Sequence, residues 1–529
     1  MRSGTWLGGR TAVLAVAVAL VGGFGAGGAG ATNTRPDASG TILLDGSKIF
    51  PIVLSKGPPR DGTTPLGGNA LDEVVGAGAN FFKVGPPTTV WTNADIDDAV
   101  QWDRAVAARG VYTWINLSTL SRAQPGSAQD TILQRVITTL KGDATGSAGL
   151  GMWKGADEPW WGGVPASALR FAYCRGTSRG DPSWCAGEPP LDSEHLWVTI
   201  QAPRGTAADL APYSAVTDTH GVDVYPVTFG NADPDLHGVG RWTSTIRSVT
   251  PSASVWTVLQ VCASGSHNGT GSYVLPTRLQ ERYMMYDAII NGARSLGFYG
   301  GNNPNCYTST DSAHGWNWTF WYTVLKGLIQ EINASSPLAP ALVDPGSNQV
   351  LSTTDSTTQA IRRDGANGDY WVIAARSGAG TRDVTIGGLP SSIASGTVYT
   401  EGRSVEVENG SFTDSFDRWG VHVYRFAPPA PTAVGVRSFS ARSVAGGVRL
   451  AWRTSSEATA LGFVLYRERG GERVRLGWSP VVAGGAARGG RYSWLDRRAP
   501  RAGRWRYRLQ AVGTDGRRSW AGTAVVRRR

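Results

Sequence analysis

Short apolar runs recur along the first two thirds of the chain and are separated by amphipathic stretches. The apolar runs predict eight strands, each followed by a helical pattern or by a loop long enough to hold a helix. The predicted strands are 50–55, 80–85, 111–117, 149–155, 195–201, 221–226, 255–261 and 295–300. Helical spacing appears at 94–109, 129–141, 164–174, 276–293 and 315–333, with Asn93 as the expected cap of the first helix and Gly110 as its end.

This alternation predicts the fold class. Strands that are apolar almost throughout are typical of a parallel sheet buried on both faces. Eight such units in about 300 residues predict an α/β fold with a (β/α)8 TIM barrel. No G-x-G-x-x-G motif opens a helix after the first strand, which disfavours a dinucleotide-binding sheet. In barrels of this kind the chemistry lies on the loops after the strands.

The pattern changes after the barrel. Short alternating runs with glycine and asparagine turns occupy 345–427, and they predict a small antiparallel sandwich. A Pro/Ala-rich hinge separates it from a third, all-β unit, in which Trp452 and the run 507–512 resemble a fibronectin type III-like module. The predicted division is a signal peptide at 1–31, a linker at 32–40, the barrel at 41–336, the sandwich at 337–427, the hinge at 428–431 and the third module at 432–529.

The N-terminus has the features of a secretory signal. Arg2 and Arg10 precede an apolar run at 11–21. Small residues then lead to Ala29-Gly30-Ala31, an A-x-A cleavage pattern. No later segment reaches the roughly 20 apolar residues that a spanning helix needs. We therefore expect an exported protein, secreted or associated with the cell surface, with no membrane span in the mature chain.

Four cysteines follow the signal. An even number in an exported protein indicates disulfides, and we expect Cys174 to pair with Cys185 across a short loop. Cys262 and Cys306 follow strands seven and eight, which are neighbours in a closed barrel, so we expect them to pair as well. No C-x-x-C or H-x-x-x-H spacing occurs, and neither a metal site nor a cofactor is expected.

Charge is distributed unevenly along the chain. The net charge is +10, yet residues 428–529 hold 21 Arg and five acids, a net charge of +16, which leaves −6 for the rest. The basic module is a candidate for contact with an anionic cell-wall or matrix polymer. Arginine bias from a GC-rich genome explains the same composition, and the whole chain has only six Lys. Nucleic acid is not an expected partner of an exported protein.

The strongest candidate for chemistry is the segment Asp157-Glu158-Pro159-Trp160-Trp161, which follows the fourth predicted strand. Adjacent carboxylates beside aromatic rings supply what glycosidic-bond chemistry needs, a proton donor and flat apolar faces for sugar rings.

Several segments, in order, resemble the clan A type of retaining glycoside hydrolases. Asp157-Glu158-Pro159 resembles the Asn-Glu-Pro that this family carries after strand four. The other matching segments are Leu44-Asp45-Gly46 with Phe50-Pro51-Ile52, the second-strand segment 76–83, the sixth-strand ending Val222-Asp223-Val224-Tyr225-Pro226, the segment 292–299 before strand eight, and the sandwich ending at 421–426. The resemblance implies a secreted hydrolase that cleaves O-glycosidic bonds in a polysaccharide or glycoconjugate, with a carbohydrate substrate.

The resemblance makes Glu158 the general acid/base. The family also carries a second glutamate at the end of strand seven, where this sequence has Gln260. Three interpretations remain. Asp223 is the second carboxylate and the enzyme inverts; Asp157 acts with Glu158 and an acetamido group of the substrate; or the barrel binds glycans without cleaving them.

Further polar and aromatic residues at the predicted strand ends are candidates for substrate binding. For stacking on sugars these are Trp114, Trp160, Trp161 and Trp316; for hydroxyl recognition they are Asn116, Gln201, Gln260 and Tyr225. Lys56 and Lys83 follow strands one and two and are expected to form structural salt bridges or to bind an acidic sugar. His220 is expected to be a core histidine.

Overall fold

The computed structural model describes residues 32–86, 88–250, 254–264, 273–343, 348–365, 368–427, 435–457, 460–470, 472–482, 489–513 and 518–528. The predicted signal peptide and the predicted hinge lie outside these residues. Within the described part of the chain, no helix combines the length and the apolar character needed to cross a membrane.

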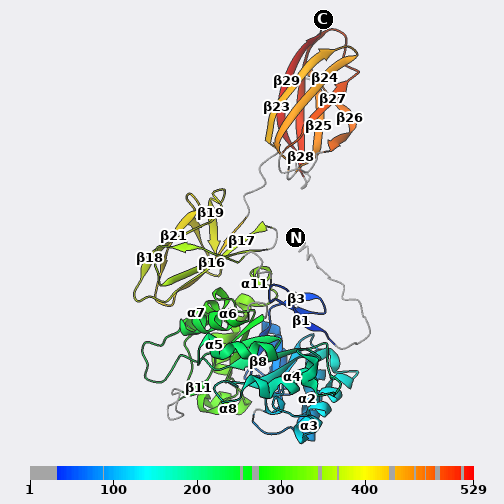
Figure 1. The fold of residues 1–529 in the computed structure, drawn as a ribbon. Helices are drawn as coiled ribbons and strands as arrows, with labels where there is room; N and C mark the ends of the chain where they lie inside the picture. Colours follow the sequence, from blue (N-terminus) through cyan, green and yellow to red (C-terminus); the bar gives the residue numbers. More distant parts are fainter. Residues whose placement is uncertain are drawn as a thin grey trace, which may run out of the picture.

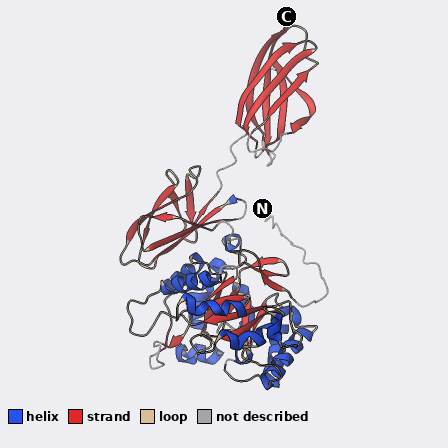
Figure 2. Ribbon diagram, in the orientation of Figure 1, coloured by secondary structure: helices blue, strands red, loops and turns tan. Residues whose placement is uncertain are grey.

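The eight predicted strands all form, and they close into a parallel barrel at the centre of the first unit (Figures 1 and 2). The barrel closes where β10 and β4 both pair with β13. The strands in chain order are β4 (Ile52–Leu54), β5 (Phe81–Val84), β6 (Tyr112–Asn116), β7 (Leu150–Asp157), β8 (Leu196–Gln201), β9 (Thr219–Asp223), β10 (Ser254–Gln260) and β13 (Ser295–Tyr299). The predicted TIM barrel is confirmed.

Helices surround the barrel strands (Figure 2). The first long helix is capped by Thr92 rather than by Asn93, because Thr92 and Asp95 form a reciprocal capping box. Gly110 follows it with φ +67°. The helices are α1 (Ala70–Ala77), α2 (Asn93–Ala107), α3 (Ala128–Gly142), α4 (Arg170–Thr177), α5 (Ala207–Leu210), α6 (Gly238–Val249), α7 (Arg278–Ile290), α8 (Ser309–His314), α9 (Trp318–Phe320), α10 (Lys326–Ile332) and α11 (Ala339–Val343).

A three-stranded N-terminal sheet covers the amino end of the barrel. It consists of β1 (Thr34–Pro36), β2 (Ile42–Leu44) and β3 (Ser47–Ile49), so the expected linker at 32–40 is partly a strand. Thr34 Oγ1 donates to the carbonyl of Gly151 at 2.8 Å and accepts from the Leu196 amide at 3.0 Å. The apolar side chains of β2 pack into the barrel interior. The carboxyl ends of the strands remain as the open end.

The two predicted disulfides are both present. Cys174 bonds to Cys185 with a Cα–Cα distance of 5.3 Å, and Cys262 bonds to Cys306 at 6.2 Å. The second bond links the loops after β10 and β13 on the open side of the barrel. The short hairpin β11 (Ala263–Ser264) with β12 (Tyr273–Val274) lies in the same region.

The second unit is an antiparallel sandwich, as predicted. Its six-stranded and three-stranded sheets enclose a separate apolar core, and its β17 and β22 pack on α7 of the barrel, where Arg282 Nη1 donates to the Val421 carbonyl at 2.6 Å. The strands are β14 (Gln349–Val350), β15 (Ser352–Thr353), β16 (Thr358–Asp364), β17 (Tyr370–Arg376), β18 (Arg382–Gly387), β19 (Ser395–Val398), β20 (Arg403–Glu406), β21 (Ser411–Phe416) and β22 (Val421–Phe426).

The third unit is a second all-β sandwich with sheets of three and four strands. Trp452 is buried between the sheets and stacks on Tyr492 with ring centroids 5.3 Å apart. The strands are β23 (Gly435–Val444), β24 (Gly447–Ser456), β25 (Ala460–Arg469), β26 (Glu472–Val482), β27 (Arg491–Asp496), β28 (Gly503–Gly513) and β29 (Arg518–Arg528).

Candidate active site

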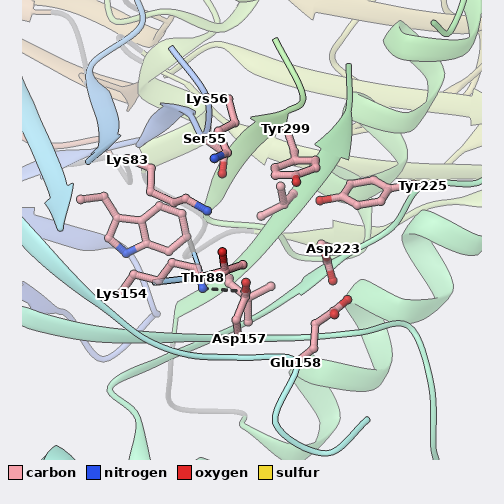
Figure 3. A pocket seen from close by; sticks show the side chains of 13 residues that line it. Ser55, Lys56, Lys83, Thr88, Lys154, Asp157, Glu158, Asp223, Tyr225 and Tyr299 are labelled. Carbon is pink, nitrogen blue, oxygen red and sulfur yellow. Dashed lines mark ion pairs between the residues drawn. The ribbon is translucent and has the colours of Figure 1, made fainter. Parts of the chain in front are cut away.

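A polar pocket of about 240 Å³ lies at the carboxyl end of the barrel strands (Figure 3). This volume is smaller than the roughly 300–1,000 Å³ of sites for drug-sized ligands, and it suits a ligand of about one small ring. The pocket is lined by Ser55, Lys56, Lys83, Thr88, Trp114, Lys154, Asp157, Glu158, Ile200, Asp223, Tyr225, Val258 and Tyr299.

A bulge in β7 places two charged side chains on the same side of the strand. Between Lys154 and Asp157 the pairing with β8 advances by three residues on β7 but by two on β8. In a regular strand, residues three apart point to opposite faces, and one extra residue restores the same face. Lys154 Nζ consequently lies 2.6 Å from Asp157 Oδ1 inside the pocket. Gly155 is required at the bulge, because a Cβ there would lie 1.9 Å from Trp197 Nε1.

Glu158 has left-handed backbone geometry, with φ +46°. Such a conformation is uncommon for a non-glycine residue and costs of order 1–3 kcal/mol. The amide of Glu158 donates to the Ile200 carbonyl at 2.7 Å, and its carbonyl accepts from the Gly162 amide at 2.9 Å. The turn directs the Glu158 carboxyl into the same pocket as that of Asp157, although the two residues are adjacent in sequence, and it faces Asp223 while Asp157 faces Lys154 (Figure 3).

The three carboxyls of the pocket have opposite protonation preferences. Burial raises the pKa of Asp157, but the charges of Lys154, Lys83 and Lys56 outweigh it and hold that pKa below its usual range. Burial, followed by the nearby carboxylates, raises the pKa of Glu158 and raises that of Asp223 well above its ordinary value. Figure 3 shows the carboxyls of Glu158 and Asp223 facing each other. The pocket thus favours the ionised form at Asp157 and the protonated form at Glu158 and Asp223.

Lysines line the side of the pocket that faces Glu158 and Asp223, and they are Lys56, Lys83 and Lys154 (Figure 3). Burial, together with the charge of Lys154, lowers the pKa of Lys83 to about 7. Burial also lowers the pKa of Lys56. Lys83 Nζ lies 5.8 Å from the ring centroid of Tyr299, and Lys154 Nζ lies 5.9 Å from that of Trp114.

Two of the aromatic candidates line the pocket. Tyr225 stacks on Tyr299 with ring centroids 5.5 Å apart. Trp114 is almost fully buried against Trp256, with centroids 5.3 Å apart, and forms the pocket floor rather than an exposed platform.

The amides expected to recognise substrate hydroxyls hold loop backbone instead. Gln260 accepts from the Val227 amide at 3.1 Å and donates to the Val227 carbonyl at 2.9 Å. Asn116 Nδ2 donates to the Pro86 carbonyl at 2.5 Å. Gln201 Oε1 accepts from the Trp160 amide at 3.3 Å. All three side chains are buried and none lines the pocket, so their expected role in binding is corrected to a structural one.

The tryptophans after β7 and β13 also lie outside the pocket lining. Trp160 is half-buried and packs on the hydrophobic core. Trp316 is 2% exposed, and its Nε1 donates to the Lys56 carbonyl at 2.8 Å, so the expected stacking position is corrected to a core position. Trp161 is 53% exposed beneath the guanidinium of Arg204, and among these three it alone presents a ring to solvent.

His220 is a core histidine, as predicted. It is fully buried, neither ring nitrogen has a hydrogen-bond partner, and burial lowers its pKa to about 4. The pocket also contains residues that the sequence reasoning missed: Ser55, Thr88, Lys154 and Tyr299. A lysine inside an otherwise apolar strand was the available signal for Lys154.

One group of metal-ligand types occurs among the described residues, Asp192, Glu194 and His195, just before or at the start of β8. Their groups already engage one another and Lys141, whose Nζ lies 3.0 Å from Asp192 Oδ1 and 3.2 Å from Glu194 Oε2. His195 Nδ1 lies 2.7 Å from Asp192 Oδ2. None of them lines the pocket.

No protein-family model and no curated protein sequence matches the chain. Among solved structures it is similar to a β-L-arabinopyranosidase from Geobacillus stearothermophilus (9% identity, 72% of this chain and 97% of that chain, TM-score 0.44). It is also similar to an alpha-amylase from Geobacillus thermoleovorans complexed with acarbose (11% identity, 72% of this chain and 99% of that chain, TM-score 0.42). A third similar structure is a family 39 glycoside hydrolase from Bacteroides cellulosilyticus (10% identity, 73% of this chain and 84% of that chain, TM-score 0.41).

Proposed function

We propose that the protein is a glycoside hydrolase that cleaves O-glycosidic bonds in a polysaccharide or glycoconjugate. The observation that carries the proposal is the gathering of three carboxyls in one pocket whose pKa values are pushed in opposite directions, that of Asp157 below its usual range and those of Glu158 and Asp223 above theirs. Paired groups whose surroundings push their pKa values apart are the basis of acid and base assignments in this chemistry.

In the proposed mechanism Glu158 donates the one proton of the Glu158–Asp223 pair to the leaving glycosidic oxygen, and both carboxyls of the pair are then ionised. The Asp157 carboxylate stabilises the positive charge that develops at the anomeric carbon, or bonds to that carbon as a nucleophile. Glu158 then takes the proton of the incoming water as general base. Lys154 acts through Asp157, since the 2.6 Å ion pair keeps that carboxyl ionised and fixes its position.

This arrangement favours Asp157 over Asp223 as the second carboxylate. An inverting pair is about 6.5–9.5 Å apart and holds a water molecule between its members. Figure 3 shows the carboxyls of Glu158 and Asp223 facing each other, and Asp223 is a hydrogen-bond partner of Glu158, which suits a partner of the acid better than the separate base of an inverting pair. The acetamido-assisted mechanism also uses Asp157 and stays an alternative for substrates that carry such a group.

The second candidate function is glycan binding without cleavage. The observation that favours it is Gln260, which stands at the end of strand seven and is committed to the backbone of Val227. Purified protein with Glu158→Gln separates the two functions. The hydrolase proposal expects a screen of glycosides to show turnover that falls at least 100-fold in this variant while binding remains. Absence of turnover in the unsubstituted protein, with glycan binding intact, supports the binding function instead.

We also propose that the chain is exported and that its third module, fibronectin type III-like, binds an anionic polymer of the cell wall or matrix. The two disulfides support export. An arginine–tryptophan cluster supports the binding role: the Arg508 guanidinium lies 3.9 Å from the ring centroid of Trp520, which is 41% exposed. Co-sedimentation of the whole chain with anionic cell-wall polymer tests it, and retention that Arg508→Ala leaves unchanged contradicts a role for this cluster.

A further inference from the structure

Three of the chain's six lysines line one pocket, in a protein with 45 arginines. Lys56 follows β4, Lys83 lies on β5 and Lys154 lies on β7. Figure 3 shows the three lysines on the wall opposite Glu158 and Asp223. A composition so poor in lysine makes their gathering at one site a feature that needs a physical reason.

The carboxylates of the pocket form an ion pair with one of these lysines and leave Lys56 and Lys83 without one. Asp157 forms its ion pair with Lys154. Of the described residues, no carboxylate lies within ion-pair distance of the ammonium of Lys56 or Lys83, and no hydrogen-bond acceptor is placed on either. Burial raises the pKa values of Glu158 and Asp223, with the charge of Asp157 adding to the rise at Glu158 and those of Glu158 and Asp157 adding to it at Asp223. One wall of the pocket therefore holds three lysines, of which Lys154 alone has a carboxylate within ion-pair distance among the described residues.

Lys56 and Lys83 are half-buried. Ammonium groups that are partly withdrawn from water and have no partner are costly, and an anion between them removes that cost. Lysine places a compact point charge with three donors on a slim stem, which fits the interior of a barrel better than the wide guanidinium of arginine. Lysine is also a common ligand of tetrahedral oxyanions as well as of carboxylates. The hydroxyl-bearing and aromatic residues beside the lysines, including Ser55, Thr88 and Tyr299, suit the uncharged part of a sugar ring.

We propose that the pocket selects a sugar unit that carries a compact oxyanion, a carboxylate or a sulfate or phosphate ester, and that Lys56 and Lys83 bind this group. The substrate class rests on the proposed hydrolase function, whereas the anion site itself does not. In this arrangement the anionic group lies on the lysine wall and the glycosidic oxygen faces the Glu158–Asp223 pair.

The test is calorimetric titration of the whole chain with D-glucuronate, D-galacturonate, D-glucose 6-sulfate, D-glucose 6-phosphate, D-glucose and D-galactose. We expect at least one anionic sugar to bind tenfold or more tightly than its neutral parent. Lys83→Met and Lys56→Met should each weaken that binding about tenfold to hundredfold, as for the loss of a charge-assisted hydrogen bond. Lys48→Met is the matched control, because Lys48 lies on β3 at the opposite end of the barrel and should leave binding unchanged.

The arms separate the sources of the anion: tight binding of a uronate identifies a carboxylate, and tight binding of a 6-sulfate or 6-phosphate identifies an ester. Unfolding curves of each variant show that the protein tested is folded. The proposal is overturned if neutral sugars bind as tightly as anionic ones, if no sugar binds to the unsubstituted protein, or if folded Lys83→Met and Lys56→Met keep the preference for anions. Lysine-dependent binding of an anionic sugar without cleavage of any glycoside would leave the anion site standing and refute the hydrolase function. Efficient cleavage of neutral glycosides alone would support the hydrolase function and refute the anion site.

Discussion

Lys154 and Asp157 lie three residues apart on one strand, yet their charged groups meet at 2.6 Å inside the pocket. The meeting depends on one extra residue in β7, which turns both side chains to the same face. The pair differs greatly in exposure, since the Lys154 side chain is 2% exposed and that of Asp157 is 49% exposed. The two partners therefore do not contribute equally to stability.

We expect removal of the carboxylate to destabilise the protein more than removal of the lysine. Asp157→Ala leaves a buried ammonium without its partner and should lower the free energy of unfolding by about 3 kcal/mol or more. Lys154→Met leaves a half-exposed carboxylate that water solvates, and should cost about 1 kcal/mol or less. Urea unfolding of both variants measures the difference. Equal losses, or a larger loss in Lys154→Met, would show that the pair does not stabilise the barrel in this way.

The acid dependence of the same pair has a defined sign. Because the folded-state pKa of Asp157 lies below the ordinary value of 3.8, its stabilisation is present above that value and is lost as the pH falls through the folded-state pKa. The stability gap between the unsubstituted protein and Asp157→Asn should therefore close on acidification below about pH 4. A gap that stays constant down to pH 2 would contradict the assignment.

The bulge in β7 predicts a sharp contrast between two glycines. In Gly155→Ala the new Cβ would lie 1.9 Å from Trp197 Nε1, and we expect a loss of about 1–3 kcal/mol together with reduced activity, because Lys154 and Asp157 are displaced. Gly76→Ala is the matched control, since Gly76 lies in α1 with no atom within 4 Å of the new Cβ. There we expect a gain of up to about 1 kcal/mol. Thermal unfolding of both variants, with an activity assay, checks the contrast.

Strand ends could be predicted from the sequence because eight apolar runs mark them directly. The rule that functional residues follow the carboxyl ends of barrel strands correctly predicted that Asp157, Glu158, Asp223 and Tyr225 lie in one pocket. Lys154 could not be assigned to the pocket, since regular alternation places it on the face opposite Asp157 and nothing in the sequence identifies the bulge.

The same rule gave the wrong role to several polar and aromatic residues. Gln260 stands at a strand end, but the backbone of Val227 satisfies both ends of its amide. Trp316 follows β13, but its indole packs against Trp318 and Trp321 in the core. Position in the chain locates a side chain near the open end of the barrel, whereas its direction depends on loop geometry that only the folded chain defines.

The Glu158–Asp223 pair predicts the basic limb of the pH–activity profile. A pair that shares one proton releases it late, because the second deprotonation would place two like charges together. In Asp223→Asn this repulsion is absent, so Glu158 should lose its proton at lower pH and the basic limb of kcat/KM should move toward acid. The pH profile of both proteins on one substrate measures the shift. An unchanged basic limb would mean that Asp223 does not share the catalytic proton.

The two disulfides should differ in their contribution to stability. Cys174–Cys185 closes 11 residues and Cys262–Cys306 closes 44. From loop-closure entropy we expect a loss of about 3 kcal/mol for the double replacement Cys174→Ser with Cys185→Ser, and about 4 kcal/mol for Cys262→Ser with Cys306→Ser. Chemical unfolding of the two double variants measures both values. The reverse order would show that strain in the folded loops outweighs the entropy of the unfolded chain.

Proton uptake should accompany the binding of an anionic sugar near neutral pH. The pKa of Lys83 is about 7, lowered by burial and by Lys154, with Lys56 also lowering it and Asp157 and Asp223 raising it. Near pH 7.5 a large fraction of the Lys83 side chains is therefore neutral. An anion beside Lys83 favours its charged form and raises its pKa, so the complex binds more protons than the free protein.

Calorimetric titration at pH 7.5 in two buffers of different ionisation enthalpy measures this uptake directly, and affinity for the anionic sugar should fall as the pH rises above 7. Lys83→Met should abolish the uptake, because it removes the group whose pKa lies near 7. Lys48→Met should preserve it, since Lys48 lies on the N-terminal sheet. Binding without proton uptake in the unsubstituted protein would mean that Lys83 is already charged before the ligand arrives, and that its contact with the anion is not what selects the substrate.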